Sequence, residues 1–385
     1  MEDSISLSAN TRRDIMKLAK SDKVNILIVA VSDDNFGDSV IKICFNSLIK
    51  VALKNIGVSN FNISNMPMNR IDKKLIANSN IIFFAGGGIL KYDYLTFYES
   101  IDKITEIADS FGVPIVFSSV GVESFDENNP KCIQLKGALC RECVKAISVR
   151  DDLGSLEKYI SGTNVEKSVV CDPAVWASYV YDIKRVEKSE TIGINVVRAG
   201  LFKANGKAWK EKDELQFLSD LIALLEKEKL QYKFFTNGHA LDENFLRIFS
   251  MANDIPDEHV ILQMNNSQKL VEEISKFGAV ITFRMHAGII SYALKAPSVA
   301  LAWNEKLTFF YETLGWQDRC FSFSDWRAET VFDKLLNIFK LEQTIEHDED
   351  YFLSVYKYIF DTLTKYCAYK WGGGYTCGTF WFRTN

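Results

Sequence analysis

Short apolar runs alternate with longer amphipathic segments along almost the whole chain. The runs have the length of buried strands, and the segments between them repeat apolar residues at helical spacing. The predicted strands form two series: residues 24–31, 81–85, 114–118, 146–149 and 168–171, followed by residues 191–197, 232–236, 259–263, 279–283 and 298–302. The predicted helices include residues 39–54, 95–111, 211–228 and 287–295. This alternation predicts parallel sheets covered by helices on both faces.

A break between the two series falls at residues 181–190, YDIKRVEKSE, a charged stretch without glycine that precedes a new strand. We interpret this stretch as an interdomain linker. The predicted fold class is therefore α/β, with two Rossmann-like domains that face one cleft. The predicted domains cover residues 1–185 and 186–345, and residues 346–385 hold a closing helix and a tail rich in glycine and aromatic residues.

Composition and charge narrow the class of protein. The 385 residues suit two domains of ordinary size. Hydrophobic residues make up 47% of the chain and charged residues 25%, as in average globular proteins, so disorder throughout the chain is excluded. The net charge of -5 argues against a nucleic-acid-binding protein, which usually carries a basic balance or a basic stripe. We therefore expect no nucleic-acid partner.

The distribution of apolar residues and cysteines indicates the compartment. No apolar run approaches the roughly 20 residues of a membrane-spanning helix, and the first 20 residues lack the apolar core of a secretory signal. The eight cysteines are scattered, which fits reduced thiols. Cys140 and Cys143 have no second CxxC pair and no histidine nearby, so we predict ordinary helix cysteines and no metal site. These features predict a cytoplasmic protein.

Candidate chemistry lies at the junctions where predicted strands lead into helices, because ligands of doubly wound folds bind beyond the carboxyl ends of the strands. The first junction contains Gly37 and Asp38. Gly37 permits a tight turn or a close approach, and Asp38 can cap the helix. The junction is either a plain helix start or a loop that binds a polar substrate. It is not a GxGxxG motif, so dinucleotide binding gains little support.

The second junction consists of three consecutive glycines, Gly86, Gly87 and Gly88, directly after a predicted strand. Three glycines together are entropically costly, so a steric demand is expected behind them. Either the backbone approaches a ligand there, or the chain turns sharply over its neighbour. A Walker A loop is excluded because no Gly-Lys-Ser/Thr follows.

The third junction, ITFRMHAG, carries Arg284 and His286 at the mouth of a helix. Residues two apart near a strand end point to the same side, so both can address one ligand. Arginine offers a planar fork for carboxylate or phosphate, histidine exchanges protons near neutral pH, and the helix dipole attracts an anion. The alternative is an arginine paired with a nearby acid and a capping histidine.

Three further residues follow predicted strands. Arg150 precedes Asp151 at another strand-to-helix junction, Arg198 follows the first strand of the second series, and His239 lies just beyond a strand. Either arginine can equally be a surface ion-pair partner. We hold His239 as a residue that lines the predicted cleft.

Seven motifs follow one another in the order seen in polysaccharide pyruvyl transferases. They are NFGD, FFAGGGIL, SVGVESF, ISVRDDLGSLEKYISG, VVCDPAV, IGINVVR and ITFRMHAGIISYALKAPSVAL. The chain resembles that family from about residue 25 to about residue 315. Members have a GT-B-like fold of two Rossmann-like domains, and they transfer the enolpyruvyl group of phosphoenolpyruvate onto sugar hydroxyls, which forms a pyruvate ketal and releases phosphate. The family loop often continues Gly-x-Gly-Pro where this chain reads Gly121-Val-Glu-Ser, which puts acceptor contacts there in doubt.

The resemblance implies roles for the candidate residues. Arg284 and His286 would hold phosphoenolpyruvate on the second domain, with Arg150 as a third contributor and the first domain on the acceptor side. The reaction protonates C3 of the donor and deprotonates an acceptor hydroxyl, so it needs an acid and a base. His286 is the candidate for one of these roles or for stabilising the leaving phosphate, and Asp38 and Glu123 are candidates for the other. No cofactor or metal is required, because phosphoenolpyruvate is the donor substrate.

The expected partners are phosphoenolpyruvate and a sugar of a cell-surface polysaccharide or its precursor. Whether the acceptor is lipid-linked or nucleotide-linked stays open. A lipid-linked acceptor would place the protein at the inner membrane surface, and Trp371, Phe380 and Trp381 in the tail are compatible with a peripheral membrane contact. Two alternatives remain: a GT-B glycosyltransferase that uses a nucleotide sugar, and a non-catalytic scaffold on the same fold.

Overall fold

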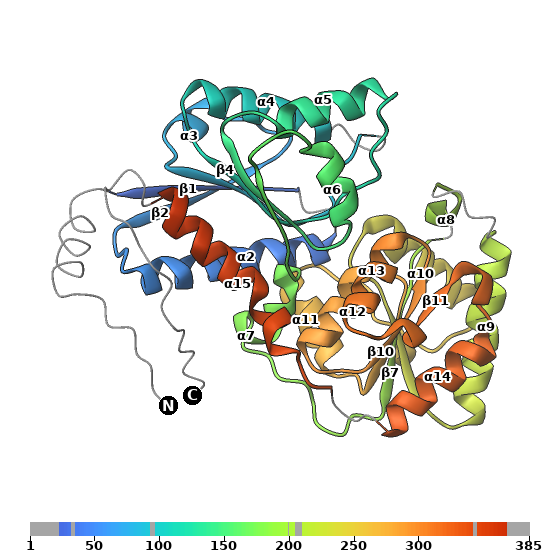
Figure 1. Ribbon diagram of the computed structural model, residues 1–385. Coiled ribbons are helices and arrows are strands. Elements are labelled where there is room, and N and C mark those ends of the chain that lie inside the picture. Colours follow the sequence, from blue (N-terminus) through green and yellow to red (C-terminus); the bar gives the residue numbers. More distant parts are fainter. Residues whose placement is uncertain are drawn as a thin grey trace.

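The computed structural model describes residues 23–31, 35–92, 97–198, 200–204, 210–341 and 345–367. Two parallel sheets with helices packed around them make up these residues (Figure 1). The aromatic tail with Trp371, Phe380 and Trp381, and the start of the first junction at residues 32–34, lie outside the described residues.

The first sheet has six strands in the order β2-β1-β3-β4-β5-β6, all parallel. Its strands are β1 (Val24–Ala30), β2 (Phe61–Pro67), β3 (Ile81–Ala85), β4 (Ile115–Val120), β5 (Val144–Val149) and β6 (Glu166–Val169). Its helices are α2 (Phe36–Ile56), α3 (Lys73–Ala77), α4 (Phe97–Ser110), α5 (Pro130–Leu139), α6 (Leu153–Tyr159) and α7 (Ala177–Val180). The central strands β3 and β4 are buried at every position, which explains why they stand out in the sequence as continuous apolar runs.

The second sheet has five strands in the order β11-β10-β9-β7-β8, again all parallel. Its strands are β7 (Thr191–Asn195), β8 (Gln231–Phe235), β9 (Ala279–Thr282), β10 (Ser298–Ala302) and β11 (Cys320–Ser322). The surrounding helices are α8 (Gly200–Ala204), α9 (Glu211–Lys227), α10 (Ala240–Ala252), α11 (Ser267–Ser275), α12 (Met285–Ala293), α13 (Glu305–Thr313) and α14 (Ala328–Leu341). The α/β class with two Rossmann-like sheets is confirmed.

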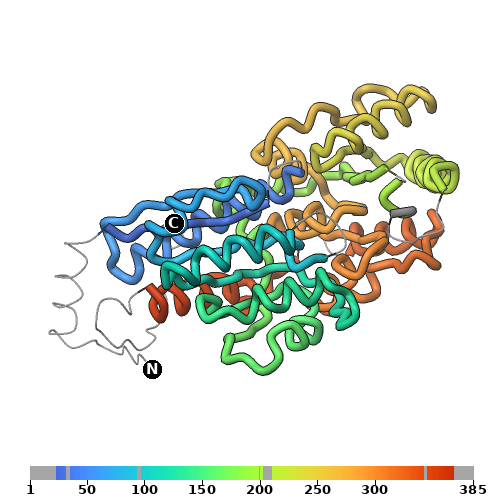
Figure 2. The backbone as a smooth tube through the Cα atoms, turned by 90° about the horizontal axis from the view of Figure 1, so that it is seen from above, coloured from blue at the N-terminus to red at the C-terminus, as the bar shows by residue number. Residues whose placement is uncertain are grey.

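The last helix, α15 (Glu349–Thr362), returns to the first sheet and packs against α2 and β4. Tyr356 accepts a hydrogen bond from Asn55 on α2 at 2.7 Å, and Tyr358 donates one to the carbonyl of Phe117 on β4 at 2.9 Å. In Figure 1 this red helix crosses the blue helix α2. Figure 2 shows it from above among segments of the first half, the part of the chain that forms the first sheet; the second half is the part that forms the second sheet. The C-terminal helix therefore belongs to the layers around the first sheet.

The structure corrects the strand predictions at the sheet edges. The strand predicted for residues 259–263 is wrong, because Val260 makes only one bridge, to Phe234, and Gln263 has a left-handed φ of 57°. The sequence pattern did not predict the edge strands β2 and β11. β2 reads FNISNMP and is only partly buried, since an edge strand needs fewer apolar residues than a central one.

Candidate active site

The loops at the carboxyl ends of the two sheets contact each other, and the candidate residues gather along this contact. Backbone N–H of Phe36, after β1, donates to the carbonyl of Asn237, after β8, at 3.0 Å. Gly238 has a left-handed φ of 83°, and any side chain there would collide with the ring of Phe36. The start of α2 is thereby held directly against the second sheet's loops.

His286 is brought to this contact by the turn between β9 and α12. The backbone N–H of Arg284 donates to Asn195 Oδ1 at 3.1 Å, and the hydroxyl of Thr282 donates to the Arg284 carbonyl at 2.6 Å. These bonds fix the turn, so that the imidazole of His286 projects to the first half and is only 7% exposed.

The ring of His286 packs against Gly37. Asn35 caps α2 by accepting from the Gly37 N–H at 2.9 Å, which places Gly37 in the first helical turn. A Cβ built on Gly37 would stand 2.5 Å from His286 Nδ1 and 2.6 Å from its Cβ. The glycine is therefore required for the close approach of the two halves, and the binding of a polar substrate by this loop stays a prediction.

Charged groups surround His286 on both sides of its ring. Nε2 lies 3.5 Å from Arg150 Nη1 and 3.9 Å from Asp172 Oδ2, and Nδ1 lies 3.9 Å from Asp38 Oδ1. Burial lowers the pKa of His286 below its ordinary value; Asp38 and Asp172 oppose this, and the Arg150 and Arg284 charges add to it. The imidazole is therefore neutral at pH 7 before any anion binds.

Arg150 and Asp172 form a buried ion pair beneath the ring of His286. Their side chains are 6% and 1% exposed. Burial disfavours the charge of Arg150, but Asp172 and the neighbouring Asp151 raise the pKa of the guanidinium above its ordinary value. Arg150 Nε has no hydrogen-bond partner among the described residues. The ion pair with Asp172 holds the charge of Arg150 in place, and the unpaired Nε is itself buried.

A second group of charges surrounds Lys306, a residue that the sequence analysis missed, near the start of α13. Lys306 Nζ lies 4.0 Å from Glu123 Oε1, and Lys91 Nζ lies 2.9 Å from the same oxygen. A Cβ on Gly88 would stand 2.7 Å from Lys306 Nζ. Burial, followed by the charge of Lys91, lowers the pKa of Lys306 to about 7, against the opposing effect of Glu123.

The three consecutive glycines therefore serve two different demands. Gly86 and Gly87 have left-handed φ values of 61° and 77°, as a sharp turn requires. Gly88 has no such φ and instead accommodates Lys306 from the other half. The sharp turn drawn from the sequence is present at Gly86 and Gly87, and the close neighbour of Gly88 is a lysine of the protein itself, so the approach of a ligand stays a prediction.

A third group forms around the fully buried carboxylate of Asp242, near the start of α10. Arg284 donates to Asp242 Oδ2 through Nε at 3.1 Å and through Nη2, and Arg198 donates to Oδ1 at 2.8 Å. His239 caps α10 and lies 3.3 Å from Arg198 Nη1. Arg284 is thus paired with an acid, as the alternative reading had it, yet it keeps 14% exposure and lies two residues from His286.

Of the candidates taken from the sequence, the structure brings together Gly37, Asp38, Arg150 and His286. Gly88 and Glu123 lie in the Lys306 group, Arg284 and His239 lie in the Asp242 group, and Gly86 and Gly87 make the turn. Three acidic and basic residues were missed: Asp172, Asp242 and Lys306. Asp172 and Lys306 follow apolar runs, at VVCDP and VALAWNEK, so their place after a strand was a usable signal.

Within the described ranges, no group of three His, Cys, Asp or Glu side chains has metal-binding geometry. None of the helices in the part of the chain that the structure describes is long and apolar enough to cross a membrane.

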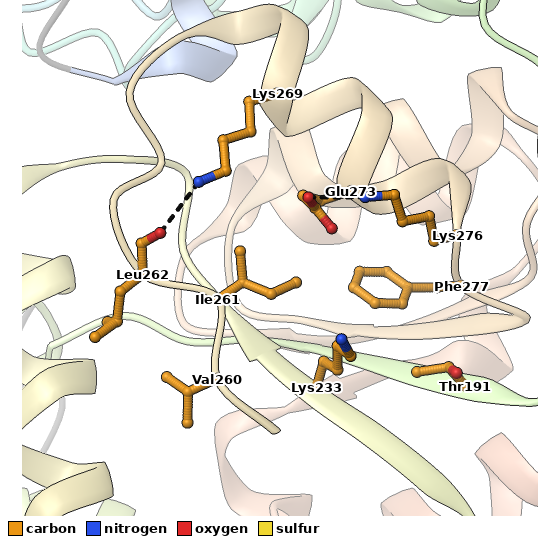
Figure 3. A pocket seen from close by; sticks show the side chains of 9 residues that line it. All are labelled: Thr191, Lys233, Val260, Ile261, Leu262, Lys269, Glu273, Lys276 and Phe277. Atoms are coloured by element: carbon orange, nitrogen blue, oxygen red, sulfur yellow. Dashed lines mark hydrogen bonds and ion pairs between the residues drawn. The ribbon is translucent and has the colours of Figure 1, made fainter. Parts of the chain in front are cut away.

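A cavity of about 470 Å³ lies elsewhere, on the second sheet between β8 and α11 (Figure 3). Its lining includes Thr191, the first residue of β7, so it opens away from the carboxyl ends of the strands. Lys269 in its wall already donates to the carbonyls of Leu262 and Gln263. None of the candidate residues lines this cavity, and we do not assign the chemistry to it.

Two parallel Rossmann-like sheets whose carboxyl-end loops meet define a GT-B-like protein. A sequence profile described as Polysaccharide pyruvyl transferase matches residues 20–305, so the chain belongs to that family and is a transferase. No curated protein matches the chain significantly.

Solved structures resemble the fold at low sequence identity. The UDP-GlcNAc 2-epimerase of Methanocaldococcus jannaschii has a TM-score of 0.57 at 12% identity and covers 89% of this chain and 100% of its own. A putative UDP-N-acetylglucosamine 2-epimerase of Listeria monocytogenes has a TM-score of 0.58 at 8% identity, with 94% and 100% coverage. The trehalose 6-phosphate synthase of Burkholderia multivorans reaches 0.51 at 9% identity, with 90% and 98% coverage. These likenesses bear on the fold alone.

Proposed function

We propose that this transferase moves the enolpyruvyl group of phosphoenolpyruvate onto two hydroxyls of a sugar in a cell-surface polysaccharide or its precursor. The observation that carries the proposal is the meeting of Arg150 from the first half with His286 and Arg284 from the second. Membership of the pyruvyl transferase family supports it independently.

The charges suit a small polyanion. Phosphoenolpyruvate carries a carboxylate and a phosphate, both of which guanidinium groups bind with paired hydrogen bonds. Asp172 and Asp242 hold Arg150 and Arg284 in place without consuming all of their donors. A bound phosphate would raise the pKa of His286, opposing the effect of burial, so that the imidazole could take up a proton on donor binding.

Protons move between groups during the reaction, but over the whole reaction no acid or base is consumed. One hydroxyl oxygen bonds to C2 while the C2–C3 double bond takes a proton at C3, phosphate then leaves, and the second hydroxyl oxygen closes the ketal. Of the two hydroxyl protons, one ends on C3 and the other on phosphate. We assign the supply of the proton to C3 to His286, protonated by donor binding. Asp38 and Glu123 remain candidates for the second role, and the proposed place of action is the cytoplasm, at the inner membrane surface for a lipid-linked acceptor.

Thermal melting tests the donor assignment. Three proteins are melted with phosphoenolpyruvate and separately with UDP, GDP and CMP: wild type, Arg284→Ala and the control Arg247→Ala. The control changes an arginine on α10 whose guanidinium donates to Asn244. A ligand at 100 times its Kd adds about 2.7 kcal/mol. We expect a shift with phosphoenolpyruvate in wild type and Arg247→Ala that is lost in Arg284→Ala. A shift with a nucleotide alone would replace the proposal with a nucleotide-sugar glycosyltransferase.

A further inference from the structure

The Lys306 side chain extends from the second half of the chain to Gly88 of the first half, where the absence of a Cβ leaves space for it. It follows β10 by four residues and stands in the first turn of α13, whose cap is Asn304. Its ammonium group lies against Gly88 and 4.0 Å from Glu123. Together with His286 against Gly37, it is the second titratable side chain of the second half that meets a glycine of the first half.

The positive charge of Lys306 is less well compensated by nearby carboxylates than the charge of its neighbour Lys91. Lys91, after β3, takes the closer position at 2.9 Å from Glu123 Oε1. Arg150, after β5, faces Lys306 as a further cation, and Asp151 contributes a buried carboxyl. Glu305 precedes it on its own helix. Two cations therefore surround Lys306 on the first half, and the nearest carboxylate is shared.

This setting changes the proton affinity of the amine. Desolvation and the charges of Lys91 and Arg150 bring the pKa of Lys306 to about 7, despite Glu123. About half of the amine is then neutral at pH 7, whereas an exposed lysine is almost fully charged. Its side chain as a whole keeps 22% exposure.

We propose that Lys306 is a catalytic residue that takes the proton from an acceptor hydroxyl, an assignment that rests on the proposed pyruvyl transfer. The Nζ lone pair accepts the first hydroxyl proton as that oxygen bonds to C2, and His286 gives its proton to C3. After phosphate leaves, His286 accepts the second hydroxyl proton and the Lys306 ammonium protonates the phosphate. Both residues are restored, and no other reactant is needed.

The first test measures the amine itself and needs no acceptor. Full-length protein is treated with a trace of acetic anhydride across pH 5–11, and acetylation of each lysine is followed by mass spectrometry. We expect the acetylation of Lys306 to rise with a midpoint near pH 7, whereas an unperturbed lysine has a pKa of about 10.4. A midpoint for Lys306 at the value of an unperturbed lysine would overturn the assignment.

The second test measures turnover. Transfer from phosphoenolpyruvate to a panel of p-nitrophenyl glycosides and UDP-sugars is followed by phosphate release and by the mass of the product. Lys306→Arg keeps the charge but has no neutral form near pH 7, and we expect it to lose activity about 100-fold or more. Lys306→Ala should recover part of its activity with added ethylamine, and the control Lys103→Arg should match wild type. An active Lys306→Arg, or a Lys306→Ala that amines do not rescue although it melts like wild type, would overturn the assignment.

Failure of the proposed function would look different. In that case wild type itself shows neither a melting shift with phosphoenolpyruvate nor phosphate release with any acceptor, and both proposals fall. If wild type binds and transfers while the Lys306 variants behave like the Lys103 control, only the assignment of Lys306 falls.

Discussion

Replacing Gly37 by alanine tests whether His286 rests against α2 in solution. The added Cβ would lie 2.5 Å from His286 Nδ1, so the ring must retreat by about 0.9 Å to reach the 3.4 Å of ordinary contact. Overpacking of this kind costs about 1–3 kcal/mol, whereas Gly→Ala in a helix contributes up to about 1 kcal/mol of stabilisation.

The expected net loss for Gly37→Ala is therefore up to about 3 kcal/mol, which lowers the Tm by up to about 12 °C in a cooperative unit of roughly 150–250 residues. The functional loss should be larger, because a displacement of about 1 Å at a catalytic group can cost about 100-fold in rate. Gly137 offers a matched control: it lies in α5, and a Cβ there meets nothing within 4 Å. Gly137→Ala should melt at or slightly above the wild-type temperature.

Differential scanning fluorimetry of the three proteins, with and without phosphoenolpyruvate, measures both effects. Under the proposed function, Gly37→Ala should melt lower and respond less to the ligand, while Gly137→Ala responds like wild type. If Gly37→Ala behaves like Gly137→Ala in both measurements, the close contact of Gly37 with His286 is not the arrangement in solution.

Three further predictions concern the buried charges. Asp172→Asn leaves Arg150 buried without its carboxylate, and the free energy of unfolding measured in urea should fall by about 3–5 kcal/mol. Lys103→Ala, which breaks an exposed ion pair, should lower it by at most about 1 kcal/mol. Equal losses in the two variants would contradict the buried pair. Burial holds the pKa of His286 below its unfolded value, so the neutral imidazole favours folding and the stability should fall as the pH drops below about 6.5. His286→Gln should remove the contribution of His286 to this fall. A pH profile of stability that is the same in His286→Gln as in wild type would contradict the prediction. Both Glu214 oxygens are buried without a hydrogen-bond partner among the described residues, and burial, then Asp242 and Glu211, raise the pKa of this carboxyl. Glu214→Gln should therefore gain stability over wild type from pH 5 to pH 8, whereas a constant difference would show that Glu214 is already ionised in the folded protein.

Much of the architecture was predictable because central parallel strands are apolar on both faces. The runs at residues 81–85 and 298–302 are fully buried strands for that reason. The edge strand β2 was not predictable, since its residues are mixed and its place depends on pairing with β1. The predicted strand at residues 259–263 failed because hydrophobicity alone does not specify a partner strand.

The candidate site was predictable where chemistry coincides with a strand end. Arg284 and His286 stood out because an arginine and a histidine two residues apart follow a buried strand. Lys306 did not, because its place after a buried strand is the only signal in the sequence, and the tertiary structure alone sets Gly88 and Lys91 of the opposite half beside it. Long-range juxtaposition of this kind is a property of the tertiary structure and leaves no local pattern in the sequence.

The return of α15 to the first sheet has a consequence for synthesis of the protein. Every residue of the candidate site has been made by the time the ribosome passes Lys306. The segment that carries Asp172 nevertheless donates hydrogen bonds to residues much later in the chain: Cys171 N–H donates to Ser354 Oγ at 2.9 Å, and Trp176 Nε1 donates to the Phe352 carbonyl at 3.1 Å. The first half therefore completes its packing only after the second half has been translated, and a message truncated before codon 352 would encode all of the site residues without the helix that anchors this loop.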